Sequence, residues 1–440
     1  MEGQISGKCI QQALNGEEFQ SIVSACVSEM TPSSSIEFLV WLLIAAAIIA
    51  MLAKRLRIPY TVSLVLGGLL LGVIHIPILS PLQPGNRPDW LTPDVILILF
   101  LPALVFEGSV KLDLQELLRN SVPLLLLANL GVLLAALVTG YIVHCLIGLP
   151  VLVALLFGSI ISATDPISVL AIFRDLEVNK RLSLIMEAES LLNDGTAVVL
   201  FGILFGAVAA GKLGVPNSVE QYFLAVAGGA VLGSALGYLA SRITGTVDDP
   251  QIEITLTTIL AYGSYLLAYH LHLSGVIATA CAGLMLGNIG ARKGMSIATR
   301  TAMQSFWVYI SFVMNSLVFL LIGLEINMRE LLENWTSVVL AIGAVLVGRV
   351  LSVYLLVPLS NRFAGEIPFR WQHVAVWGGL RGALALALAL SLGSTFPYRA
   401  QILNLTFGVV IFSILVQGLT MKPLLKILKL ANGDSSLRQP

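Results

Sequence analysis

Three carboxylates stand inside two long apolar stretches of this sequence, where a lipid bilayer disfavours charge. Asp165 belongs to the run SATDP, and Glu189 and Asp194 belong to the run ESLLNDG. A charge at the centre of a membrane helix costs about 3 kcal/mol, so such residues are rare and usually mark ion pathways. Three acids in so short a segment predict an ion-binding site at membrane depth.

The polar residues around Asp194 have a spacing that suits the binding of a cation. Ser190 and Asp194 are four residues apart and share one helix face, while Glu189 and Asn193 share the neighbouring face. Hard cations take oxygen ligands. We therefore expect the first face to bind an alkali cation and the second to support the site. The expected ligands are Asp194, Asp165, Ser190 and Thr164, with carbonyl groups freed near Asp165.

Two arginines, Arg349 and Arg381, lie deep in predicted membrane helices and need counter-charges. We predict that Arg381 pairs with Glu189, and that Arg349 finds an acid or helix-end carbonyls. Glu189 then stays ionised, whereas Asp165 and Asp194 are left repelling each other and partly desolvated. Both effects favour a protonated carboxyl. A proton and a cation would then compete for one site, which is the physical basis of antiport.

The composition places the chain among polytopic helical membrane proteins. Of its 440 residues, 57% are hydrophobic and 11% are charged, and the mean hydropathy is +0.91, whereas a soluble domain is about 25% charged. The net charge of +0 gives no indication of a nucleic-acid partner. The four cysteines lack metal-ligand spacing. Cys9 and Cys26 could pair if the polar N-terminal segment is outside the cell.

The hydropathy pattern predicts thirteen membrane spans, since a helix needs about 20 apolar residues to cross a bilayer. Most Lys and Arg residues follow odd-numbered spans or lie in the tail, which favours an outer N-terminus and a cytoplasmic C-terminus. The predicted spans are 36–53, 60–79, 91–109, 120–146, 150–173, 182–211, 218–243, 252–271, 274–290, 300–324, 335–358, 371–392 and 400–421.

Thirteen spans can be divided into six, a linker and six, as in transporters built from inverted repeats. Two spans in corresponding positions carry helix-breaking residues: Pro166 in the fifth, and Gly378 and Gly379 in the twelfth. Proline removes a backbone donor. Irregular backbone is tolerated at membrane depth only where it lines a cavity or finds protein partners. We therefore predict two broken helices beside the carboxylates.

These motifs resemble the sodium–proton exchangers of the NhaP/NHE type, in the Asn-Asp branch of the monovalent cation/proton antiporters. The resemblance rests on ISATDPISVLAIF, EAESLLNDGTAVVLF and GGLRGALALALAL, supported by LPALVFEG, FLLIGLE, GRVLSVY and VQGLTMKPL in the same order. It implies alternating access, an electroneutral one-for-one exchange and a homodimer in the lipid bilayer. It also implies that Asp194 binds ion and proton, that Asp165, Ser190 and Thr164 assist, and that Asn193 holds the broken helices together.

The resemblance further implies a division into a moving core and a dimerisation domain. Neither an enzymatic activity nor a cofactor is expected; the transported ions are Na⁺ (or Li⁺ or K⁺) and H⁺. The short tail favours a prokaryotic plasma membrane or a thylakoid membrane. The expected parts are an extracytoplasmic segment 1–35, dimerisation spans in 36–109, core spans in 110–211, a linking span in 212–243, dimerisation spans in 244–324, core spans in 325–421 and a cytoplasmic tail 422–440.

Other interpretations of these residues remain open from the sequence. Asp165 could cap a helix end, Glu107 could be interfacial or paired, and Glu187 could line an inner funnel or extend to the membrane surface. A cation channel or a transporter of another substrate would also place acids in the membrane. An intramembrane aspartyl protease would require a Gly-x-Gly-Asp context, which neither Asp165 nor Asp194 has.

Overall fold

The computed structural model describes residues 32–56, 60–73, 93–246, 249–291, 294–326, 328–363, 365–393 and 395–431. This part of the chain contains helices and no strand, in agreement with the predicted all-α class. The Cys9–Cys26 pairing, residues 1–31 of the predicted extracytoplasmic segment and residues 432–440 of the tail lie outside the described residues.

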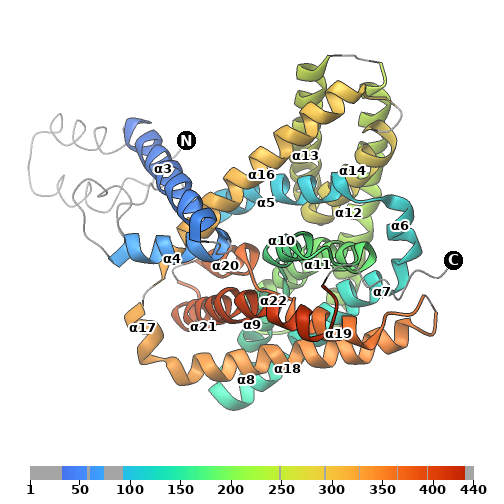
Figure 1. The fold of residues 1–440 in the computed structure, drawn as a ribbon. Coiled ribbons are helices and arrows are strands. Elements are labelled where there is room, and N and C mark those ends of the chain that lie inside the picture. The colour runs from blue at the N-terminus through green and yellow to red at the C-terminus, as the bar shows by residue number, and fades with distance from the viewer. Residues whose placement is uncertain are drawn as a thin grey trace, which may run out of the picture.

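The helices of the described chain are coloured in sequence order in Figure 1. Their bounds are α3 (Pro32–Leu56), α4 (Tyr60–Val73), α5 (Pro93–Lys111), α6 (Leu114–Arg119), α7 (Ser121–Leu125), α8 (Val132–Ile147), α9 (Val151–Ser162), α10 (Ile167–Asp175), α11 (Lys180–Ala210), α12 (Val215–Thr244), α13 (Pro250–His270), α14 (Gly275–Met285), α16 (Ile297–Glu325), α17 (Met328–Glu333), α18 (Trp335–Ser360), α19 (Phe369–Trp377), α20 (Ala383–Leu390), α21 (Arg399–Phe412) and α22 (Gly418–Ile427).

Ten helical segments of the described chain are long and apolar enough to cross a membrane. They coincide with ten of the predicted spans. The other three predicted spans coincide with α4, with α5 and with Gly275–Gly290, which is α14 extended by a π-helical turn. The short helices α6 and α17 lie in stretches for which no span was predicted.

Two spans are interrupted where the sequence carries proline and glycine. One break separates α9 from α10, and the other separates α19 from α20. The two breaks contact each other, because the Asp165 N–H donates a hydrogen bond to the Leu380 carbonyl at 2.7 Å. The predicted broken helices are therefore present, and they meet near the carboxylates.

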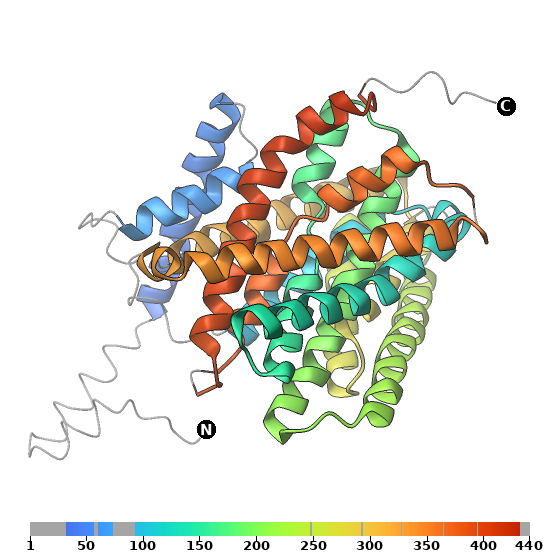
Figure 2. The same cartoon turned by 90° about the horizontal axis from the view of Figure 1, so that it is seen from below.

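Around the breaks, the helices pack closely through small residues. Gly229, Gly233 and Gly237 face α14 along α12, and a Cβ on Gly233 would lie 2.0 Å from the Ala278 carbonyl oxygen. Small residues at this spacing let membrane helices approach closely. On another side, the long helix α18 packs on α8 and α21 (Figure 2).

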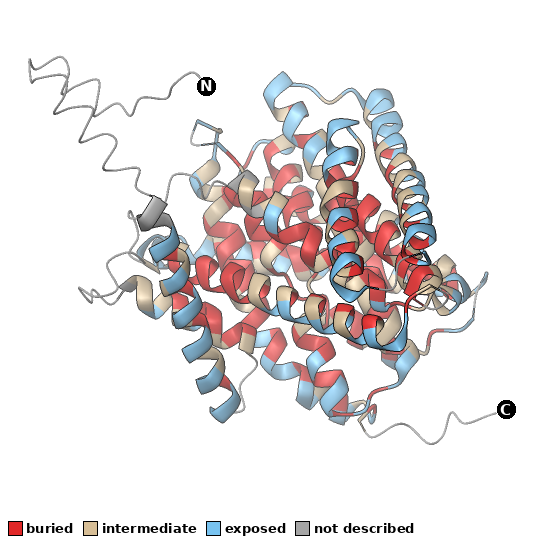
Figure 3. Cartoon of the chain, turned by 90° about the horizontal axis from the view of Figure 1, so that it is seen from above, coloured by how far each residue is buried: buried red, intermediate tan, exposed pale blue. Residues whose placement is uncertain are grey.

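Buried residues gather in the middle of the molecule, whereas the outer helices are exposed on their outward faces (Figure 3). Many of those outward side chains are large and apolar, as at Ile48 and Met51 of α3 and Phe223 and Val231 of α12. A broad apolar exterior of this kind is expected of a protein surrounded by lipid.

Candidate ion-binding site

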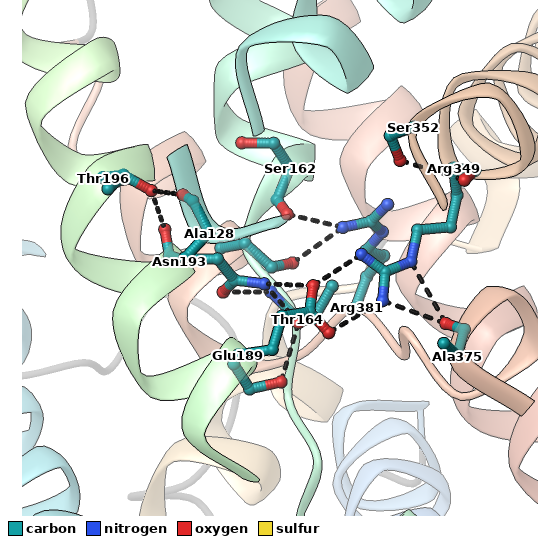
Figure 4. A network of polar contacts seen from close by, with 12 residues as sticks. Ala128, Ser162, Thr164, Glu189, Asn193, Thr196, Arg349, Ser352, Ala375 and Arg381 are labelled. Carbon is teal, nitrogen blue, oxygen red and sulfur yellow. Dashed lines mark hydrogen bonds and ion pairs between the residues drawn. The ribbon is translucent and has the colours of Figure 1, made fainter. Parts of the chain in front are cut away.

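Asn193 of α11 connects that helix to the break between α9 and α10. Its side-chain oxygen accepts from the Thr164 N–H at 3.3 Å, and its amide nitrogen donates to the Thr164 hydroxyl at 2.6 Å (Figure 4). The same hydroxyl lies 2.8 Å from the Ser190 hydroxyl. All three residues are buried. These contacts satisfy polar groups that the break would otherwise leave without partners at membrane depth.

Asp165 and Asp194 differ from these buried neighbours because both remain partly exposed. They line a common cavity of about 100 Å³. Asp165 Oδ1 accepts from the Ile167 N–H at 2.9 Å, so Asp165 does cap the start of α10. Asp194 Oδ1 has no hydrogen-bond partner among the described residues. The site therefore offers a carboxylate oxygen to a ligand that enters the cavity.

Glu189 lies beside this site, but its ion-pair partner is Arg349 of α18. Two guanidinium nitrogens of Arg349 donate to the two carboxylate oxygens of Glu189, at 2.6 and 2.9 Å. Arg349 also donates to the Ala375 carbonyl near the end of α19, at 2.9 Å. Both charged side chains are almost fully buried. Such a bidentate pair fixes the two helices relative to each other.

The predicted pair between Glu189 and Arg381 is therefore wrong. Arg381 lies in the second break and donates to the carbonyls of Ser162 and Ala163, at 2.7 and 3.2 Å. These groups lie at the carboxyl end of α9, where the helix dipole favours a positive charge. Its own N–H donates to the Ser413 hydroxyl at 2.7 Å. Arg381 thus supports the site through a helix end rather than through an acid.

Glycines in the second break allow very close approaches. A Cβ on Gly382 would lie 2.3 Å from the Asp165 Cβ, and a Cβ on Gly379 would lie 2.8 Å from Arg349 Nε. At Gly378 the nearest atom is the Val374 carbonyl oxygen, at 2.7 Å. The break must therefore be lined by glycine for Asp165 and Arg349 to occupy their positions.

A second cavity, of about 360 Å³, leads away from Asp194 along α10 and α11. Glu187 lines it together with Arg174, and a role of Glu187 in an inner funnel stays a prediction. Glu107 also lines it and forms an ion pair with Lys111, which agrees with one of the two interpretations left open for this residue. The cavity therefore extends from Asp194 to the exposed Arg174 and is lined by both signs of charge.

Some residues of the site carried no sequence signal that would have placed them there. Ser413 lies in an apolar helix, and Gly382 was one glycine among several in its motif. Asn315 of α16 lines both cavities with Asp194, but it is separated from Asp194 by more than a hundred residues. For Asn315, the hint available from the sequence was an amide side chain inside a predicted apolar span.

The sequence is similar to known proteins over most of its length. The family model "Sodium/hydrogen exchanger, transmembrane" matches residues 42–427. The chain is 41% identical to the Na⁺/H⁺ antiporter NhaH of Halobacillus aidingensis, over 90% of this chain and 98% of that one. It is also 41% identical to the Na⁺/H⁺ antiporter NhaP of Pseudomonas aeruginosa, over 76% of this chain and 81% of that one.

The fold was compared with solved structures as well. It is similar to that of the sodium proton antiporter MjNhaP1 from Methanocaldococcus jannaschii, with a TM-score of 0.73 over 90% of this chain and 98% of that one, at 22% sequence identity. The fold agrees with the sequence matches, and together with the family match over most of the chain these findings show that the protein belongs to the sodium/hydrogen exchanger family.

Proposed function

We propose that this protein is a secondary antiporter that exchanges Na⁺ for H⁺ across a membrane. The observation that carries the proposal is the pair Asp165 and Asp194, which face one cavity while their neighbours are buried and hydrogen-bonded. Family membership and two relatives named as Na⁺/H⁺ antiporters support it. The protein is accordingly a transporter rather than an enzyme, and it needs no cofactor.

The cation site consists of Asp194, Asp165, Ser190 and Thr164. Asp194 Oδ1, which lacks a hydrogen-bond partner in the described chain, is the primary ligand. Glu189 does not bind the ion, since both of its oxygens are occupied by Arg349. Its charge is balanced by that arginine, which leaves the two aspartates to bind a proton or a cation.

Exchange follows from competition at this site. A proton bound to Asp194 removes the negative charge that attracts Na⁺, and bound Na⁺ repels the proton. One ion of each kind per cycle makes the exchange electroneutral. Alternating access carries the site between the two sides as the broken helices move against the rest of the protein.

The larger architecture is part of the same proposal. It has thirteen spans, arranged as two inverted six-span repeats and a linking span, with an outer N-terminus, a cytoplasmic C-terminus and a homodimeric assembly in a prokaryotic plasma membrane or thylakoid membrane. The hydrogen bond that joins the two helix breaks supports the division into inverted repeats. The proposed parts are dimerisation spans in 36–109 and 244–324, core spans in 110–211 and 325–421, and a linking span in 212–243.

Proteoliposomes with an acidic interior and an internal pH dye test this function. We expect external Na⁺ to alkalinise the interior, with no effect of clamping the voltage with valinomycin and K⁺. Li⁺ and K⁺, added in turn, rank the transported ions. Asp194→Asn should lower the rate at least ~100-fold, because an amide neither ionises nor attracts a cation. Glu116→Gln, at an exposed acid of α6, is the matched control.

The outcomes separate the alternatives. Alkalinisation that depends on voltage would retain the antiporter but contradict the one-for-one exchange. Cation flux without proton movement would indicate a channel. No response to any of the cations would point to another substrate, and exchange that survives in Asp194→Asn would remove Asp194 from the site.

A further inference from the structure

Asn315 is a buried polar residue of α16 whose side-chain nitrogen forms a hydrogen bond while its side-chain oxygen forms none among the described residues. It is 3% exposed, and its amide nitrogen donates to the Ser311 hydroxyl at 3.4 Å. Its amide oxygen, Oδ1, has no hydrogen-bond partner in the described part of the chain. A buried acceptor without a partner is unfavourable and requires an explanation, such as an ion or a water molecule that it binds.

The position of Asn315 indicates what kind of partner its unpartnered oxygen binds. Asn315 and Asp194 both line the cavity of about 100 Å³ and the cavity of about 360 Å³. Asp194 Oδ1 is likewise buried and without a partner among the described residues. An ionised carboxylate oxygen and an amide oxygen are both acceptors and cannot satisfy each other, whereas one donor or cation in the cavity that the two residues line would satisfy both.

The two residues come from different helices. Asp194 belongs to α11, whereas Asn315 belongs to α16, which packs on α4 and α5. Thr164 and Ser190, two of the other oxygen-bearing residues of the site, contact each other between the first break and α11. Asn315 therefore reaches the cavity from a helix that supplies none of the other proposed ligands.

We propose that Asn315 is a specificity-determining residue of the cation site, and that its amide oxygen completes the coordination of the cation held by Asp194. This inference rests on the proposed antiport. An amide oxygen is a hard, neutral ligand suited to a small cation. It adds no charge, so it leaves the one-for-one exchange unchanged. Because it comes from a different helix than the other ligands, it sets the size of the site and hence the preference among Li⁺, Na⁺ and K⁺.

The neighbouring residue provides a matched control. Ser316 is 2% exposed, and its hydroxyl also has no hydrogen-bond partner among the described residues. However, Ser316 is not among the described residues that line either cavity. Asn315→Leu and Ser316→Ala therefore each remove an unpartnered oxygen atom from the same helix. Only the first removes it from a residue that lines the cavities.

The experiment uses the full-length protein and two measurements. In proteoliposomes, Asn315→Leu should raise the KM for Na⁺ at least ~10-fold with little change in kcat, the scale expected for one lost polar contact. It should also change the order or the spread of KM values among Li⁺, Na⁺ and K⁺. In detergent, Na⁺ should raise the Tm of the wild type by binding the folded state, and much less so in Asn315→Leu. Ser316→Ala should match the wild type throughout.

Each result decides the inference. A folded Asn315→Leu whose Na⁺ KM, ion order and Na⁺-dependent Tm shift equal those of the wild type overturns it, as does an equal change in Ser316→Ala. If Asn315→Leu does not fold, Asn315→Ala is judged by the same criteria. If the wild type itself shows neither exchange nor a cation-dependent Tm, the proposed antiport has failed, which distinguishes that outcome from failure of the Asn315 assignment alone.

Discussion

Carboxylates of two kinds stand side by side in this protein. Glu189 is neutralised by Arg349 through two short hydrogen bonds, while Asp165 and Asp194 face a cavity. The difference follows from the neighbours of each residue and not from its type. A paired acid holds two helices together, whereas an unpaired acid leaves its oxygens open to a proton or a cation.

The Glu189–Arg349 pair can be tested by stability. Removing one member of a buried pair leaves an uncompensated charge, which costs about 3–5 kcal/mol. We expect Glu189→Gln and Arg349→Met each to lower the Tm strongly, and the double variant to lose clearly less than the sum of the two. Thermal unfolding in detergent measures this effect.

Arg381→Met provides the comparison for this test of single and double variants. Arg381 donates to carbonyls rather than to Glu189. The lowering of Tm by Arg381→Met should therefore add to the lowering by Glu189→Gln, so that the double variant loses the full sum. Compensation with Arg381 instead of Arg349 would restore the pair that the sequence suggested and contradict the structure.

At the scale of elements, the crossing of two broken helices determines where the carboxylates lie. Asp165 is held between the start of α10, which it caps, and the Leu380 carbonyl of the other break. The two arginines bind helix-end carbonyls, Arg381 near the end of α9 and Arg349 near the end of α19. The breaks are therefore built from polar contacts that replace the missing helical hydrogen bonds.

Gly382→Ala tests this crossing. The new Cβ would lie 2.3 Å from the Asp165 Cβ, so the two breaks must separate, at a cost of about 1–3 kcal/mol for overpacking. We expect a lower Tm and a raised KM for Na⁺. Gly202→Ala is the control, since a Cβ there meets no described atom within 4 Å. Equal behaviour of the two variants would show that the crossing tolerates the extra carbon.

At the scale of the whole molecule, the long helix α11 carries the site and connects the two proposed sides of the membrane. It runs from Lys180 to Ala210, and at 1.5 Å per residue it is long enough to span the hydrocarbon core. Lys180 at its start and Lys212 just after its end are both exposed. The proposed topology places Lys180 inside and Lys212 outside.

Cysteine labelling checks that orientation. In a cysteine-free background, a membrane-impermeant maleimide should label Lys212→Cys in intact cells, and should label Lys180→Cys only after the cells are permeabilised. The reverse pattern would invert the proposed topology. Labelling of both positions in intact cells would contradict a spanning α11.

The sequence by itself determined the features that depend on local chemistry. Apolar runs of sufficient length fixed the helical class, because backbone polar groups in lipid must be satisfied within a helix. Pro166 and the Gly378–Gly379 pair marked both breaks, since these residues weaken a helix wherever they occur. The position of these acids inside apolar runs marked Asp165 and Asp194 as the proposed site for the same local reason.

Tertiary structure alone decided which distant residues meet. The sequence led us to pair Glu189 with Arg381, and only the packing of α18 showed that Arg349 lies within 2.6 Å of it instead. Likewise, nothing local to Asn315 indicated that α16 would place it on the same cavities as Asp194. Such partnerships depend on how helices pack, and packing is a property of the folded chain that no single segment of sequence carries.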